Sequence, residues 1–136
     1  MSQIPEDLHL TDSDRDLAAL QGAWEQTDLE ADGISNPPDD HGAPGALCRF
    51  TGNHFAVRTI EGTLLLEGTF TIDASAAPRQ ITWVDSMGAN RGEALPAIYK
   101  LEGDHFVFIA GDEDKPRPTT FRTGPGQTMR TFVRKW

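Results

Sequence analysis

The sequence predicts an all-β domain, an antiparallel up-and-down barrel of about eight strands preceded by one short helix. From Ala23 onward, apolar residues recur at every second position in short runs such as "HFAV", "TLLLEGTFTI" and "HFVFIA", and this alternation indicates strands with one buried face. Only residues 12–21 show a helical pattern. Because no second helix can cover the apolar face of the sheet, the sheet must stack on itself or close into a barrel.

The predicted helix occupies "TDSDRDLAALQG". Thr11 or Ser13 can accept hydrogen bonds from the free amides at the start, acidic residues favour the positive end of the helix dipole, and Gly22 ends the helix. Residues 1–11 are polar and acidic without periodicity, so we expect a flexible arm there and one barrel domain over residues 12–136.

Nine runs have the pattern of strands, whereas an antiparallel meander closes only with an even number. The runs are 23–31, 46–52, 54–60, 63–72, 79–84, 95–102, 105–110, 119–123 and 128–135. Eight strands are therefore expected, with one run as a continuation or an edge ribbon. Successive connections alternate between ends, which gathers the long segments 32–45, 85–94 and 111–118 at one end, the mouth. The tight turns at 102–104 and 124–126 are expected at the opposite end.

The start of the first strand resembles a known family. A short helix leading into Gly22-Ala23-Trp24 resembles the Gly-x-Trp signature of lipocalins, and the long first connection resembles their lid-like loop. From about residue 16 to 135 the chain also resembles an uncharacterised bacterial lipocalin-like domain family first catalogued in planctomycetes. That resemblance is carried by "DLAALQGAWE", "LLLEGTFTID", "LPAIYKLEGDHFVF" and "KPRPTTFRT". It implies a lipocalin-like barrel and no established activity.

The same resemblance implies a role for Trp24, which in lipocalins packs across the closed end beneath a basic side chain of the last strand. The last run, "RTFVRKW", offers Arg130, Arg134 and Lys135, and we expect Arg134 to be that residue. Such a plug also makes physical sense, because an indole fills volume and a guanidinium stacked on it adds about 0.5–2 kcal/mol of cation–π energy.

Composition limits the partners and the compartment. The chain carries 21 acidic and 12 basic residues, for a net charge of −9, and has one cysteine. A negative field disfavours nucleic acid, and no apolar run approaches the ~20 residues of a membrane helix. The first residues lack the pattern of a secretory signal. We therefore expect a cytoplasmic protein that binds neither nucleic acid nor membrane.

The predicted ligand site is the barrel cavity, lined by Phe55, Phe70, Trp83, Tyr99, Phe106, Phe108 and Phe121. The alternative is that these aromatic residues simply fill a small core. Arg91 and Arg117, in two mouth loops, could bind a carboxylate or phosphate of the ligand. Alternatively, Arg117 latches its own loop to an acid such as Asp112 or Asp85.

Three functions follow from these alternatives. The leading one is a protein that binds a small hydrophobic or amphipathic molecule. The second is a filled-core interaction module whose acidic rim, "PPDDH" and "GDEDKPRP", meets a basic protein partner. The third is an enzyme such as an isomerase or cyclase that uses the cavity, with Asp28, Tyr99 or a mouth acid as its reactive group. No catalytic residue, metal ligand or cofactor is assigned.

Two residues on the first strand raise a question about the interior. If Trp24 points inward, Gln26 and Asp28 do so too, and an unpaired buried carboxylate is costly. Either the interior is wet near the mouth, or a bulge turns Asp28 outward, and we favour the bulge. Cys48, beside Arg49, is expected to be a small core residue.

Overall fold

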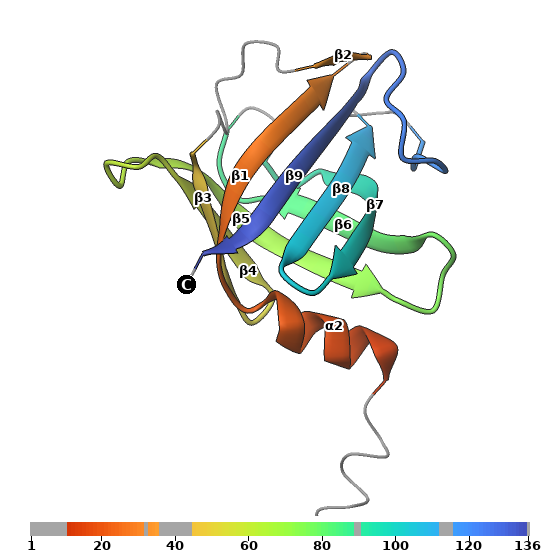
Figure 1. The fold of residues 1–136 in the computed structure, drawn as a ribbon, viewed down its shortest axis with the longest axis horizontal. Helices are drawn as coiled ribbons and strands as arrows, with labels where there is room; N and C mark the ends of the chain where they lie inside the picture. The colour runs from red at the N-terminus through yellow and green to blue at the C-terminus, as the bar shows by residue number, and fades with distance from the viewer. Residues whose placement is uncertain (1–10, 32, 36–44, 89–90, 112–115, 136) are drawn as a thin grey trace, which may run out of the picture.

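The computed structural model describes residues 11–31, 33–35, 45–88, 91–111 and 116–135. Within these ranges the chain forms one helix, α2 (Asp12–Leu20), and nine strands (Figure 1). The strands are β1 (Gly22–Ala31), β2 (Ile34–Ser35), β3 (Leu47–Thr51), β4 (His54–Arg58), β5 (Leu64–Asp73), β6 (Arg79–Asp85), β7 (Ala94–Glu102), β8 (His105–Gly111) and β9 (Gln127–Lys135). The predicted flexible arm, residues 1–10 in particular, lies outside the described residues.

Eight of the strands close into an antiparallel up-and-down barrel, which confirms the predicted fold class. The sheet runs in the order β2-β1-β3-β4-β5-β6-β7-β8-β9, and β1 also pairs with β9. The remaining strand, β2, has only two residues and pairs with the end of β1 outside the barrel closure. The architecture is consistent with a calycin-like fold.

The helix forms where the sequence predicts and lies across one end of the barrel (Figure 1). The Thr11 hydroxyl caps the helix by accepting a hydrogen bond from the Asp14 amide, and the Asp14 carboxylate accepts one from the Thr11 amide. Gly22, with a φ of 107°, turns the chain into β1, a backbone conformation that other residues rarely adopt. We call this end, where residues 52–53, 74–78 and 103–104 connect strands, the closed end.

One predicted strand does not form. Residues 119–123 are irregular, so β8 and β9 are joined by a single connection spanning 112–126. This removes the odd strand and moves 124–126 from the closed end to the mouth, which corrects the expected position of that turn. The mouth therefore carries the connections after β1, β4, β6 and β8, of which 36–44, 89–90 and 112–115 lie outside the described residues.

Trp24 fills the closed end of the barrel. Its side chain is 0% exposed, and its indole nitrogen donates a 2.8 Å hydrogen bond to the Leu20 carbonyl of α2. Arg134 of β9 stacks on the ring, with its guanidinium carbon 4.3 Å from the ring centroid. The same guanidinium donates to the carbonyls of Ala19 and Gln21. These contacts join helix, first strand and last strand at one point.

A bulge in β1 decides which side chains enter the barrel. The β1–β9 register shifts between Gln26 and Asp28. Gln26 consequently points inward and is buried, whereas Asp28 is exposed and Leu29 takes the next buried position. The expectation that a bulge turns Asp28 outward is confirmed, and the interior avoids an unpaired carboxylate.

Candidate functional site

The barrel interior contains a small cavity in the half nearer the mouth. Its volume is about 60 Å³. A water molecule accounts for about 30 Å³ of liquid, so the cavity holds two waters or one carboxylate-sized group. It is lined by Gln26, Cys48, Phe55, Val57, Leu66, Trp83, Phe108, Arg130 and Phe132. Most of these side chains are inward positions of alternating strands, so the wall is mainly apolar.

Three polar side chains interrupt this apolar wall. Arg130 of β9 donates from Nη1 to Oε1 of Gln26 on β1 at 3.2 Å. Because the amide oxygen accepts this bond, the amide nitrogen of Gln26 faces elsewhere, and it has no hydrogen-bond partner among the described residues. Within the same part of the chain, the indole nitrogen of Trp83 also has none. Gln26 is 2% exposed and Trp83 is 6% exposed. Folding has therefore removed both N–H groups from water without giving either a described protein acceptor.

Unsatisfied buried donors carry a free-energy cost of roughly 1–3 kcal/mol each. In native proteins nearly all such groups are paired with protein or ordered water, so an orphaned pair at one cavity needs an explanation. Here the two residues that carry these donors, Gln26 and Trp83, line the same cavity as Arg130. The arrangement suits a guest that accepts hydrogen bonds and carries negative charge.

Below this cavity, aromatic rings fill the barrel. The core cluster includes Trp24, Phe50, Phe55, Phe70, Trp83, Tyr99, Phe106 and Phe132. Phe106 lies near its centre, with ring centroids 5.9 Å from both Trp24 and Phe50. A drug-sized ligand needs a pocket of about 300–1,000 Å³, which this interior does not provide.

Cys48 is the one thiol at the cavity, and its environment suppresses its reactivity. It is 3% exposed, and burial raises the pKa of its thiol to about 12. A thiol that remains protonated is a poor nucleophile. The geometry therefore does not assign a covalent role to Cys48.

The structure distributes the predicted cavity residues over three places. Phe55, Trp83 and Phe108 line the cavity. Phe70, Tyr99 and Phe106 are 1%, 1% and 0% exposed and belong to the packed core beneath it. Phe121 lies apart from them, in the irregular segment after β8, where the Lys100 ammonium sits 4.5 Å from its ring centroid.

Tyr99 has a structural partner. Its hydroxyl donates a 2.6 Å hydrogen bond to Asp16 of α2, which also accepts from Arg79 at 3.0 Å. Burial, followed by the bond to Asp16, raises the pKa of Tyr99. The hydroxyl therefore fastens the helix to the closed end and points away from the mouth.

The two arginines proposed at the mouth are not brought together as a pair. Arg117 donates to the carbonyls of Ile81 and Ala97 at 3.1 and 2.7 Å and to the Thr82 hydroxyl at 2.9 Å. Arg91 is exposed in the turn between β6 and β7. Arg117 thus latches its segment to the wall, through strand carbonyls and a hydroxyl rather than through an acid.

Sequence reasoning missed several residues of the cavity. Val57, Leu66 and Phe132 follow the alternation of their strands and were available from that signal. Arg130 was considered only as a cover for Trp24. Its contact with Gln26 depends on the pairing of β1 with β9, which no local pattern reveals.

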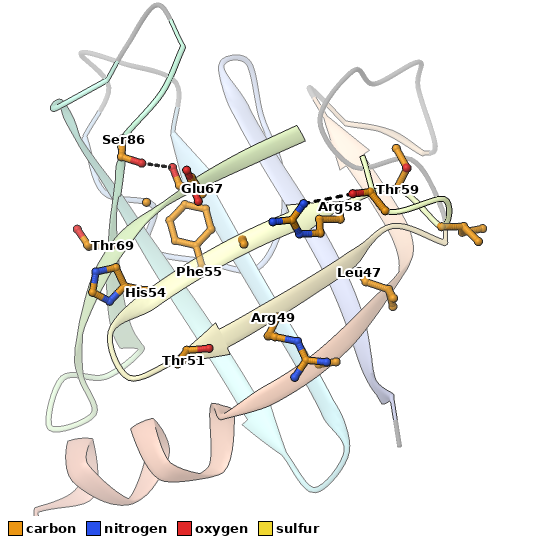
Figure 2. Close-up of a pocket in the computed structure, with 15 residues that line it drawn as sticks. Leu47, Arg49, Thr51, His54, Phe55, Arg58, Thr59, Glu67, Thr69 and Ser86 are labelled. Atoms are coloured by element: carbon orange, nitrogen blue, oxygen red, sulfur yellow. Dashed lines mark hydrogen bonds between the residues drawn. The ribbon is translucent and has the colours of Figure 1, made fainter. Parts of the chain in front are cut away.

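A second hollow lies on the outer face of β3, β4 and β5 (Figure 2). It has a volume of about 660 Å³. Its lining includes Leu47, Arg49, Thr51, His54, Ala56, Arg58, Ile60, Glu67, Thr69 and Ser86. Phe55 borders both this groove and the inner cavity, so the groove lies directly behind the cavity wall.

Comparison of the chain with protein-family models, with curated proteins and with solved structures finds no match. Among the described residues, no helix has the length and apolarity needed to cross a membrane. The same part of the chain holds no group of three or more His, Cys, Asp or Glu side chains placed to bind a metal ion. The two hollows are therefore the features of the described structure that bear on function.

Proposed function

We propose that the protein binds a small amphipathic carboxylate in the mouth half of its barrel. The observation that carries this proposal is the pair of buried, unpartnered donors, Gln26 Nε2 and Trp83 Nε1, at a cavity that Arg130 also lines. A carboxylate offers about four acceptor sites and a negative charge. It therefore suits two N–H donors and a guanidinium better than a neutral apolar molecule does.

The cavity volume limits how this ligand is held. About 60 Å³ admits the carboxylate and little more, so the apolar part of the ligand extends toward the mouth. The side chains on that path, Val57, Leu66 and Phe108, are partly exposed and apolar. The proposal keeps the predicted amphipathic ligand and specifies that its polar end enters first.

Nuclear magnetic resonance of the tryptophan indole groups tests this proposal. Titration with sodium butyrate should shift the Trp83 indole N–H resonance saturably, because that donor gains an acceptor. The Trp24 indole should not respond, since it already donates to Leu20, and it serves as an internal control. Butyramide, which has a similar size and no charge, should bind at least about tenfold more weakly, a difference of about 1.4 kcal/mol.

Variants assign the response to the cavity. Arg130→Met and Gln26→Leu should each weaken butyrate binding, whereas Lys100→Met, on the outer face of β7, should leave it unchanged. If no carboxylate from acetate to octanoate shifts the Trp83 indole, the ligand proposal fails. The tight aromatic filling of the barrel then favours the second candidate, an interaction module with a filled core.

Kinship with lipocalins is part of the proposal. It is supported by Gly22-Ala23-Trp24 at the start of β1 and by the stacking of Arg134 on Trp24. A cytoplasmic location and a basic partner at the acidic mouth stay predictions. Residues 37–41 and 112–115, which supply most of that acidic rim, lie outside the described residues.

A further inference from the structure

The outer groove is hollow because small residues alternate with long ones on its floor. Arg49 points outward from β3, and the strand pairing places Ala23 of β1 on one side of it and Ala56 of β4 on the other. Gly68 of β5, which pairs with the inward-facing Phe55, also borders the groove. The long side chains therefore rise as walls around a low floor.

The groove concentrates positive charge on a negatively charged protein. Arg49 and Arg58 lie on neighbouring strands (Figure 2), in the diagonal positions of the Arg49–Ala56 and Leu47–Arg58 pairs. Diagonal neighbours stand roughly 7–8 Å apart, close enough for two guanidiniums to contact one anionic segment. His54 lies at one end, and Glu67 is the only acidic side chain among the described residues of the lining. The whole chain, by contrast, has a net charge of −9.

No described residue neutralises either arginine. Among the described residues, the Arg49 side chain is exposed and has no hydrogen bond or ion pair. Arg58 donates to the Gly62 carbonyl at 3.2 Å and, within the same part of the chain, has no carboxylate partner. Because these two cations lack a counter-charge within the described part of the chain, they are available to recognise an external anion.

An apolar contact lies beside these cations. Ile60 is 75% exposed, the only large hydrophobic side chain so exposed in the described part of the chain. It lines the same groove as the partly buried Leu47. A partner that uses both features must carry acidic and apolar side chains.

We propose that the outer groove of β3, β4 and β5 binds an extended acidic peptide segment of a partner protein. Carboxylates of the segment contact Arg49 and Arg58, and an apolar side chain packs on Ile60 and Leu47. The groove is open and many of its side chains are exposed, so it would leave a small molecule largely in solvent, whereas a pocket buries most of its ligand. An extended segment gains affinity from several contacts along three strands.

Fluorescence polarisation with a defined probe tests this proposal. The probe is a fluorescein-labelled peptide of sequence Glu-Leu-Glu-Leu-Glu-Leu-Glu, and its matched control has Gln in place of every Glu. We expect saturable binding of the acidic peptide, at least about tenfold tighter than the control. Affinity should fall when sodium chloride is raised from about 0.05 to 0.2 M, because the contacts are exposed charges.

Substitutions locate the binding. The double variant Arg49→Gln and Arg58→Gln should lower the affinity at least about tenfold, and Ile60→Ser should lower it less. Lys100→Gln, an exposed cation on β7, is the matched control and should have no effect. Amide shifts should cluster at residues 47–60. Butyrate binding in the barrel should persist in the double variant, which separates this proposal from the proposed function.

Three results would overturn the proposal. Equal binding of the acidic and neutral peptides would show that the groove does not recognise the negative charge of the peptide. Equal affinity of the double variant would place the site elsewhere. Displacement of the peptide by an equimolar amount of inorganic phosphate would show a general anion site rather than a peptide groove.

Discussion

Trp24 shows how one side chain can determine the closure of a barrel. It contributes volume, a hydrogen bond to α2 and a face for Arg134 of the last strand, so three elements distant in sequence meet on one ring. The Gly-x-Trp pattern made this position recognisable, because a glycine with positive φ must separate the helix from β1.

Trp24→Ala is expected to lower the free energy of unfolding by about 3–5 kcal/mol, as for other large aromatic residues truncated in cores. Urea denaturation followed by circular dichroism measures it. Trp24→Phe keeps most of the volume but loses the bond to Leu20 and should cost less. A loss below about 1 kcal/mol for the alanine variant would mean that the plug is not needed for stability.

The polar residues of the cavity include a contact that could not be predicted from a single sequence. Alternation from Trp24 predicted that Gln26 points inward, and it does. The contact with Arg130 lies 104 residues away in sequence and depends on a register that the bulge before Asp28 sets. Local patterns predict which face a residue takes, but they do not predict its partner across a strand pair.

At the scale of elements, the run 119–123 illustrates how tertiary context overrides a local pattern. Thr119, Thr120, Phe121 and Thr123 have the composition of a strand. If this run had formed an additional strand of the barrel, the first and last strands would have had to pair in parallel. Without it, β9 pairs antiparallel with β1. The segment is held by side chains: Thr123 donates to Glu30 from both its hydroxyl and its amide, and Arg117 bonds to β6 and β7.

Arg117→Met should therefore loosen this segment without affecting the inner cavity. The loss of three hydrogen bonds from a charged group is expected to lower the free energy of unfolding by about 1.5–3 kcal/mol. Hydrogen exchange should accelerate in residues 116–126. Arg91→Met is the control, because Arg91 is exposed in a turn. A weaker affinity for butyrate in Arg117→Met would instead support the predicted ligand role of Arg117.

At the scale of the whole molecule, the strand number and the buried faces were predictable, and the volume of the interior was not. Alternation placed Phe70, Trp83 and Phe106 inside, and all are buried. Whether these rings leave an open cavity or a filled core depends on how they tilt against one another. The rings of Trp83 and Phe108, for example, are inclined at 51° with their centroids 4.8 Å apart. Side-chain packing of this kind follows from the complete three-dimensional arrangement, because each ring restricts its neighbours.

A closed barrel makes the ionisation of its buried thiol a measure of global unfolding. Burial raises the pKa of Cys48 from an ordinary value of 9.0 to about 12, so between these values the folded state retains a proton that the unfolded state releases. The contribution of the thiol to stability is complete below pH 9 and is lost as the pH rises toward 12.

Between about pH 8 and pH 10.5, the wild-type protein should therefore lose about 2 kcal/mol more unfolding free energy than Cys48→Ala. Urea denaturation of both proteins at each pH measures this difference. The two proteins differ only at residue 48, so the contributions of all other groups cancel in the comparison. Equal pH dependence would show that the thiol ionises in the folded state, which requires water to reach the cavity beside Gln26 and Trp83 without unfolding of the barrel.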